Sequence, residues 1–511
     1  MKRYMKNLYL LIIIISLLAH FGCSKKEKEM TEVELKQYLD SQEQMYEDIS
    51  GQMATALWNF YNGEANADLK TPKQRFYQLF NDATLNATID KWYGAKDTIQ
   101  DPAITRRVVI WRTIIRSGKV NLNPEIVNME EQLYSYLIQA DKQETKPAAE
   151  EIQNKIVELM KLRNAKAKEA GYTDYAFFVL ESSNLGSVLF NKAIDEIERI
   201  TRKPYEDLIT QYKKEIRKKD IEFSAIKELL DLYAGYIVKP EVKADKIPSI
   251  AKETLANIGI NYDTLPLHIE EKQLPVGMER MGFALKIPSD YRIILSPGTG
   301  LEGRMNELGR AFNALFNKSA EPILKGYEGT IGSTCDAFME GMADIGARIV
   351  RNPEWLIKFN GMTDKKIKSD KEKAFRIAPL YLRYLLSDIM LEIELYKNPE
   401  QNFMEARDTI MKKYLLLDKP MTDPIAQSTY MMMVIKPVYK QNYLIGNIIS
   451  FQVHLALEKK FGRDYVFNTK AGEFLRQNLY ADGELYSWQT RIKMATGSTL
   501  DVRNYLRTYG Q

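Results

Sequence analysis

The chain has 511 residues, of which 45% are hydrophobic and 27% are charged, as is typical of a globular protein with a buried core. Its formal net charge is +4. Three positive charges, Lys2, Arg3 and Lys6, lie within the first 22 residues, so the rest of the chain carries only +1. This near-neutral balance excludes the broad basic surface with which proteins bind nucleic acid.

The N-terminus predicts export. The apolar run from Leu8 to Ala19 follows the basic residues and is too short to span a bilayer comfortably, as in a cleaved signal peptide. Gly22-Cys23 resembles the end of a lipobox. We therefore expect a lipoprotein signal peptide at residues 1–22, then a lipidated Cys23 and a charged tether over residues 23–45. The alternative is a plain secretory signal beside an unrelated cysteine.

Lipidation of Cys23 would make the membrane a partner through the lipid anchor. The expected location is the cell envelope, as an outer-membrane lipoprotein that faces the periplasm or the cell surface. Cys335 is the second of the two cysteines, so a lipidated Cys23 leaves no intrachain disulfide. Cys335 itself is expected to be an inert thiol, since no histidine lies near it in sequence to act as a base.

Helical periodicity dominates the remainder of the chain, with apolar residues at three- and four-residue steps among mixed charges. No low-complexity linker or fixed-period repeat divides it, so residues 46–511 are expected to form a single, mainly α domain. One segment differs. Residues 282–296 alternate branched and polar residues around Pro288-Ser289-Asp290, which predicts a small β-hairpin.

The stretch "RMNELGRAF", residues 304–312, has the frame of a zinc-peptidase helix, H-E-x-x-H, with both histidines replaced. A second helix is predicted over residues 333–356, with Ser333 as its N-cap and a stop at Asn352-Pro353. Its polar stripe contains Asp336, Glu340, Asp344 and Arg348. Such a stripe is more often a solvated face than a set of metal ligands.

These segments resemble landmarks of the angiotensin-converting-enzyme family of gluzincin zinc dipeptidases. "DYRI" (290–293), "NELGR" (306–310), "FMEGMAD" (338–344) and "NYLIGNIISFQVHLAL" (442–457) occur in the order in which that family has its strand, zinc helix, second ligand helix and tyrosine-containing helix. The resemblance implies a large two-lobed helical fold with a deep central cleft and a small sheet or hairpin next to the site. A typical member of that family is a zinc peptidase.

The resemblance also implies roles for individual residues. Glu307 falls on the general base and Glu340 on the third metal ligand, whereas Asn306 and Arg310 replace the two zinc-binding histidines. Tyr443 falls on the tyrosine that stabilises the oxyanion in the family, and Met433 replaces a second histidine. Asp344 is a further position expected to line the cleft. The chain is thus similar to a degenerate member of the family.

An arginine cannot become a metal ligand, because it keeps its proton and its charge repels a dication. We therefore expect no metal cofactor, with zinc only if the family site is somehow retained. In place of the metal we predict an ion pair between Arg310 and Glu340. Without zinc there is no activated water and no Lewis acid, so peptide hydrolysis by the family mechanism is not expected.

The leading hypothesis is an exported, membrane-anchored pseudo-peptidase that binds a peptide or a protein partner. One alternative is an active metallopeptidase or peptidyl-dipeptidase with a rearranged metal site built on Glu307, Glu340 and Tyr443. The other is a structural cell-envelope lipoprotein. Binding is inferred from the fold by analogy alone.

Overall fold

The computed structural model describes residues 30–64, 67–142, 149–237, 239–275, 278–328, 335–421, 425–503 and 505. The signal peptide and Cys23 expected from the sequence lie outside these residues. The chain divides into two units, Met1–Gln42 and Glu43–Gln511, and the candidate site and the cavity described below lie in the second. The expected boundaries after residues 22 and 45 stay predictions.

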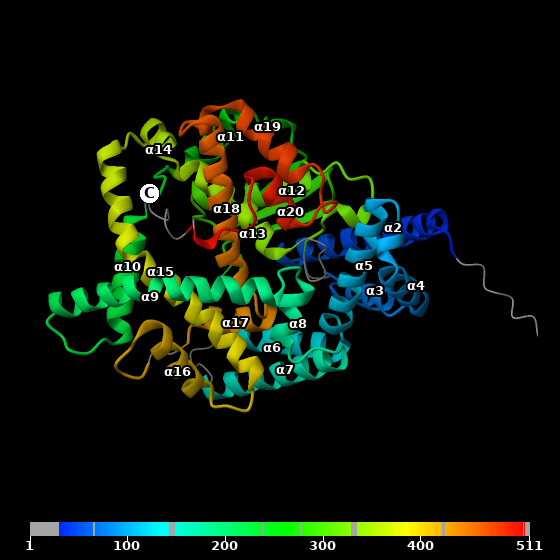
Figure 1. Cartoon of the computed structure of the whole chain (residues 1–511), viewed down its shortest axis with the longest axis horizontal. Helices are drawn as coiled ribbons and strands as arrows, with labels where there is room; N and C mark the ends of the chain where they lie inside the picture. Colours follow the sequence, from blue (N-terminus) through cyan, green and yellow to red (C-terminus); the bar gives the residue numbers. More distant parts are fainter. Residues whose placement is uncertain are drawn as a thin grey trace, which may run out of the picture. The chain divides into compact units, whose positions relative to one another are not determined.

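The described residues are mainly helical, as predicted (Figure 1). Most helices are amphipathic and several begin at side-chain caps, such as Asn352 before the helix that starts at Pro353. In chain order the α-helices are α2 Glu32–Tyr61, α3 Lys70–Phe80, α4 Ala83–Gly94, α5 Pro102–Asn121, α6 Pro124–Lys142, α7 Ala149–Glu169, α8 Tyr175–Ser182, α9 Ser187–Glu215, α10 Phe223–Tyr236, α11 Ile247–Asn257, α12 Leu301–Leu315, α13 Asp336–Arg351, α14 Pro353–Asn360, α15 Asp364–Lys397, α16 Phe403–Leu415, α17 Gln427–Ile435, α18 Lys440–Phe461, α19 Thr469–Leu475 and α20 Trp488–Thr496.

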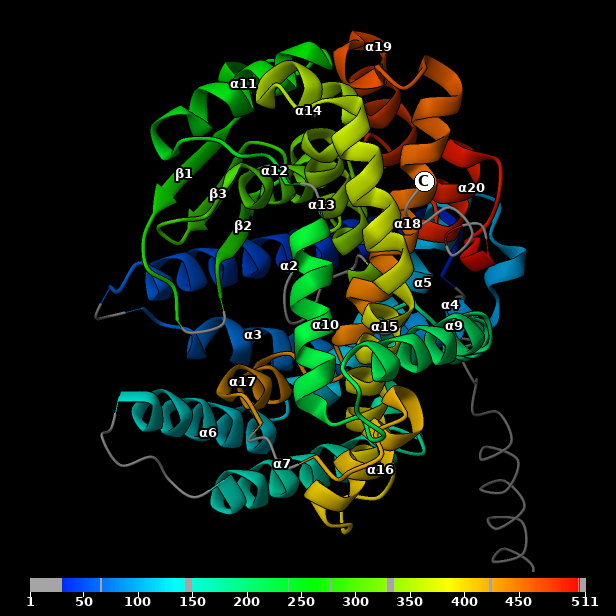
Figure 2. The same cartoon turned by 90° about the vertical axis from the view of Figure 1, so that its left-hand side faces the viewer.

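The predicted hairpin is present. Strands β2, Arg280–Lys286, and β3, Asp290–Leu295, pair antiparallel, with Gly282 opposite Ile293. A further strand, β1 at Leu267–Glu271, was not predicted, and it pairs parallel to β3, so the order is β1-β3-β2. The sheet packs against α12, which lies beside it in Figure 2. A mainly helical fold with a small sheet next to the candidate site is therefore confirmed.

The second predicted helix is two helices in the structure. α13 ends at Arg351 and α14 begins at Pro353, which confirms the predicted stop, because proline cannot continue the preceding helix. The predicted cap Ser333 lies outside the described residues, and Cys335 takes the N-cap position of α13. No helix among the described residues is both long enough and apolar enough to cross a membrane.

Glycines allow α12, α13 and α18 to cross at very short range. A Cβ atom on Gly346 of α13 would lie 1.9 Å from the carbonyl oxygen of Met305 in α12. Where α13 meets α18, a Cβ atom on Gly446 would lie 2.7 Å from Cβ of Glu340. Since real side chains cannot occupy such positions, these crossings require glycine, and they bring the polar residues of three helices together.

Candidate functional site

Helices α12 and α13 supply the central residues of the site. Asn306, Glu307 and Arg310 lie on α12, and Glu340 lies on α13. Gly309, next to Arg310, packs against backbone atoms of α13, where a Cβ atom would lie 2.5 Å from the carbonyl oxygen of Met342. This close approach brings the guanidinium of Arg310 within reach of α13.

The predicted Arg310–Glu340 ion pair is present. Nη2 of Arg310 lies 2.7 Å from Oε1 of Glu340. The other terminal nitrogen of Arg310, Nη1, lies 3.3 Å from Oε2 of Glu328. Its Nε lies 3.8 Å from Oε1 of Glu307. One guanidinium thus faces three carboxylates. Burial acts to lower the pKa of Arg310, but the three acids outweigh it and hold that pKa well above its ordinary value.

Glu340 is held in its charged form. Burial acts to raise its pKa, yet Arg310, Lys436 and a hydrogen bond from Tyr439 more than offset this, so the pKa lies below its ordinary value. The hydroxyl of Tyr439 donates to Oε1 of Glu340 at 2.7 Å. Tyr439 also packs edge-on against Tyr443, with ring centroids 5.3 Å apart.

Tyr443 stands at the exposed rim of this group, with 42% of its surface accessible. Partial burial together with the charge of Glu340 raises its pKa to about 12, so it is a neutral phenol at physiological pH. Its neighbour Tyr439 has a pKa well above the ordinary value, through burial and the carboxylates of Glu340 and Asp336. Both phenols are therefore protonated at physiological pH, with Tyr439 donating to Glu340 and Tyr443 lying at the exposed rim.

Glu307 is 2% exposed and faces the sheet. Nε of Arg280 in β2 lies 3.8 Å from Oε2 of Glu307 and donates to Oδ1 of Asn306 at 3.0 Å. The amide oxygen of Asn306 therefore already has a cationic partner. Gly282, on the same strand, leaves room for Glu307, because a Cβ atom there would lie 2.5 Å from its Oε1.

Three buried oxygens of this site have no hydrogen-bond partner among the described residues: Oε1 of Glu307, Oε1 of Glu328 and the hydroxyl of Tyr291. Glu328 is the acid least well compensated. Burial raises its pKa to about 7, although Arg310 opposes the shift. At neutral pH this carboxyl is therefore close to half-protonated.

A catalytic metal ion does not fit these residues. Arg310 occupies the space between Glu307 and Glu340 and has no lone pair to offer a cation. Tetrahedral zinc sites use neutral imidazole, thiolate or carboxylate ligands, and a fixed positive charge among them repels the dication. In the described part of the chain, no three His, Cys, Asp or Glu side chains are grouped so that they could hold a metal ion.

The described histidines have other partners. His268 in β1 lies 3.0 Å from Glu270, and His454 in α18 lies 2.9 Å from the hydroxyl of Tyr465. Burial, with Arg348 nearby, lowers the pKa of His454 to about 3, so it stays neutral. Cys335 is buried, and burial raises the pKa of its thiol to about 12, consistent with an inert cysteine.

The remaining sequence candidates lie apart from Arg310. Asp344, one turn beyond Glu340 on α13, accepts from Arg348 at 2.9 Å and binds the hydroxyl of Ser450. Met433 in α17 is 2% exposed, and its carbonyl accepts from Nη1 of Arg163 at 2.8 Å. Nothing in these contacts assigns either residue a functional role, so their roles stay predictions, as do those of Glu307 and Tyr443.

Sequence reasoning missed Glu328, Tyr439, Arg280 and Tyr291. Glu328 lies in a loop, Tyr439 is the N-cap of α18, and Arg280 and Tyr291 lie in strands β2 and β3. Of the four, only Tyr291 falls within a quoted motif, DYRI, and that motif gave it no role. A usable signal did exist in the small residues of the helices. Gly309 and Gly346 mark the α12–α13 crossing in the sequence itself.

Comparison with known proteins supports the fold. No protein-family model matches the sequence, and no curated protein matches it significantly. Among solved structures, an M32 carboxypeptidase from Deinococcus radiodurans R1 is 16% identical with a TM-score of 0.62, over 93% of this chain and 97% of that chain. A Pyrococcus furiosus carboxypeptidase is 14% identical with a TM-score of 0.66, over 94% and 99%. Trypanosoma cruzi metallocarboxypeptidase 1 is 12% identical with a TM-score of 0.63, over the same shares.

These neighbours show a large helical metallopeptidase fold of the gluzincin type, and they correct the family expected from the sequence. The assignment to the angiotensin-converting-enzyme family is wrong, because the structural neighbours are M32 carboxypeptidases and oligoendopeptidase F-like peptidases. The angiotensin-converting-enzyme family and these structural neighbours are alike in being gluzincin-like helical peptidases. Short ordered motifs therefore identified the common fold but not the family within it.

Proposed function

We propose that this protein is a pseudo-peptidase, a peptidase-fold protein that has lost metal-dependent hydrolysis and acts by binding a peptide or a protein partner. The observation that carries the proposal is the position of Arg310. Its guanidinium lies 2.7 Å from Glu340 and 3.8 Å from Glu307. Glu307 is the acid of the H-E-x-x-H frame, and Glu340 is the acid of the second helix that the resemblance places on a metal-ligand position.

The chemistry of such a site is limited. Glu340 is held as a carboxylate by Arg310 and Tyr439, so it is not poised to exchange a proton near neutral pH. The nearest phenols have raised pKa values and act as donors rather than bases. Phenol and guanidinium groups suit the recognition of carbonyl or carboxylate oxygens, and without a metal ion the set has no Lewis acid to polarise a peptide carbonyl.

We further propose that the protein is exported and held at the outer membrane through a lipidated Cys23, which keeps the binding domain in the cell envelope. This rests on the sequence of residues 1–23 alone.

The proposal is tested by assaying the purified protein on short unblocked peptides, with and without a metal chelator, alongside measurement of its metal content. The proposal expects no chelator-sensitive cleavage and less than stoichiometric transition metal. Chelator-sensitive turnover would instead establish the alternative of an active enzyme with a rearranged site.

A further inference from the structure

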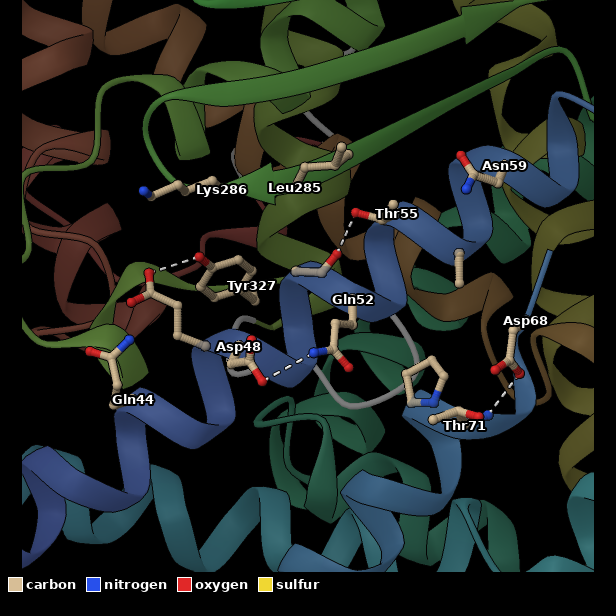
Figure 3. A pocket seen from close by; sticks show the side chains of 14 residues that line it. Gln44, Asp48, Gln52, Thr55, Asn59, Asp68, Thr71, Leu285, Lys286 and Tyr327 are labelled. Carbon is tan, nitrogen blue, oxygen red and sulfur yellow. Dashed lines mark hydrogen bonds between the residues drawn. The ribbon is translucent and has the colours of Figure 1, made fainter. Parts of the chain in front are cut away.

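A cavity of about 630 Å³ opens along α2, and its lining includes Tyr327, next to Glu328 in sequence, but none of the residues that contact Arg310. Figure 3 shows its side chains, with those of α2 below and the end of β2 above. Eight α2 residues line it at helical three- and four-residue steps: Gln44, Glu47, Asp48, Gly51, Gln52, Thr55, Ala56 and Asn59. The volume falls within the range of small-molecule and peptide pockets.

The cavity is a long groove rather than a round pocket. At 1.5 Å per residue, the stripe from Gln44 to Asn59 extends about 22 Å along the helix. An extended chain rises about 3.3 Å per residue, so the groove matches about six residues of an extended segment. Gly51 closes it against the sheet, since a Cβ atom there would lie 2.9 Å from the carbonyl oxygen of Leu285.

The acidic residues of the groove already have partners. Glu47 binds Lys325 at 2.5 Å and accepts from the hydroxyl of Tyr327 at 2.9 Å. Asp48 lies 3.0 Å from Arg75. Asp68, just before α3, accepts from the backbone N–H of Thr71 in the first turn of that helix at 3.0 Å. These acids therefore do not demand a cationic ligand.

Three polar side chains of the groove remain available. The amides of Gln44 and Asn59 form no hydrogen bond with other residues that the structure describes, and each carries both donors and an acceptor, as a peptide group does. Lys286, at the end of β2, is exposed, and its ammonium contacts no carboxylate in the described part of the chain. An unpaired lysine in the same groove as two free amides favours a ligand that has peptide groups and a carboxylate.

We propose that this groove, and not the Arg310 cluster, holds an extended peptide segment of about six residues, with a carboxylate of that segment on Lys286. The inference rests on the proposed binding function and gives it a location and a ligand chemistry. The carboxylate belongs either to an acidic side chain or to the C-terminus of the peptide.

The test uses fluorescence anisotropy with the purified full chain in detergent. The probe is a fluorescein-labelled hexapeptide, Ser-Thr-Val-Glu-Thr-Ser, with a free C-terminus. Two further probes replace its glutamate by glutamine or its C-terminus by an amide. We expect saturable binding of the first probe and an affinity loss of about tenfold in one of the other two, which identifies the source of the carboxylate.

Thr55→Trp fills the middle of the groove from an exposed position and is expected to weaken binding at least about tenfold. Thr210→Trp, at an exposed position of α9 outside the groove, is the matched control and should leave the affinity for the probe unchanged. Lys286→Glu should weaken binding to a similar extent, whereas Lys286→Arg should retain it. If Thr55→Trp fails to fold, the comparison of Lys286→Glu with Lys286→Arg tests whether the groove binds the peptide.

The groove is ruled out if no probe binds the wild-type chain at about 1 mM, or if Thr55→Trp and Lys286→Glu both bind within about twofold of wild type. Equal affinity for all three probes would remove Lys286 from the proposal. Either of these results would rule against the groove without bearing on the proposed loss of hydrolysis. Conversely, chelator-sensitive cleavage would overturn the proposed function without changing the effect of Thr55→Trp.

Discussion

Nη2 of Arg310 lies 2.7 Å from Oε1 of Glu340, so a cation that belongs to the chain lies beside the acid that aligns with a metal-ligand position. Two more carboxylates, Glu328 and Glu307, lie within 3.8 Å of the same guanidinium. Buried carboxylates in such numbers repel one another, and Arg310 offsets that repulsion. The pair thus links the stability of the fold to the proposed loss of hydrolysis.

Removing the charge of Arg310 should destabilise the protein strongly. Arg310→Leu leaves three acids without their cation, so we expect the free energy of unfolding at pH 7 to fall by about 3–5 kcal/mol. Urea unfolding of Arg310→Leu, Glu340→Gln and the double variant gives the coupling energy between the two residues, expected at about 1–3 kcal/mol.

Lys203→Ala serves as the control for this cycle, because it breaks an exposed pair with Asp207 on α9. It should change stability by less than about 1 kcal/mol. Additive effects of Arg310→Leu and Glu340→Gln would mean that the two side chains are adjacent without being energetically linked.

Stability should fall as the pH rises through the titration of Glu328. Burial raises its pKa from 4.5 to about 7, so between these values the folded state keeps a proton that the unfolded state has released. Its contribution is complete below about pH 4.5 and lost above about pH 7. We expect Glu328→Gln to flatten the decline measured by urea unfolding between pH 5 and about pH 7.5. An unchanged slope in that variant would show that Glu328 is ionised throughout.

The α12–α13 crossing should tolerate no side chain at Gly346. A Cβ atom there would lie 1.9 Å from the carbonyl oxygen of Met305, so Gly346→Ala must separate the helices, at an expected cost of at least about 2 kcal/mol. Gly94→Ala is the matched control, since nothing lies within 4 Å of a Cβ atom at this helical position. That change should be neutral or slightly stabilising. Equal thermal unfolding of the two variants would refute the close crossing.

Membrane attachment should depend on Cys23 alone. We expect the wild-type protein to incorporate labelled palmitate and to sediment with membranes, and Cys23→Ser to do neither, because the lipid chains supply the partitioning free energy. Cys335→Ser is the control with the other cysteine removed. Soluble wild-type protein in a cell that processes lipoproteins would leave the plain secretory signal as the explanation.

Much of the fold was accessible from the sequence, because its signals are local. Periodicity predicted the helices, Asn352-Pro353 predicted the end of α13, and Pro288 marked the turn of the hairpin. The parallel pairing of β1 was missed, since nothing in a five-residue strand specifies a partner 24 residues away.

The candidate site was predicted only as far as its helices carried motifs. Arg310 follows from the H-E-x-x-H frame, Glu340 from the FMEGMAD motif of the second helix, and their pairing from the positive charge that two buried acids require. Glu328 and Tyr439 depend on how a loop and the start of α18 fold back onto the site, and no local pattern encodes that. The groove along α2 was missed for a similar reason, because a polar helix face looks the same in sequence whether it borders solvent or a cavity.

The central claim is that Arg310 has replaced the metal, and zinc soaking of crystals tests it most directly. We predict no zinc peak in anomalous difference maps beside Glu307 and Glu340 in the wild-type protein. The double variant Asn306→His with Arg310→His, which restores two imidazoles one helical turn apart, should show one. A fully occupied zinc ion beside these acids in the wild-type crystals would contradict the account.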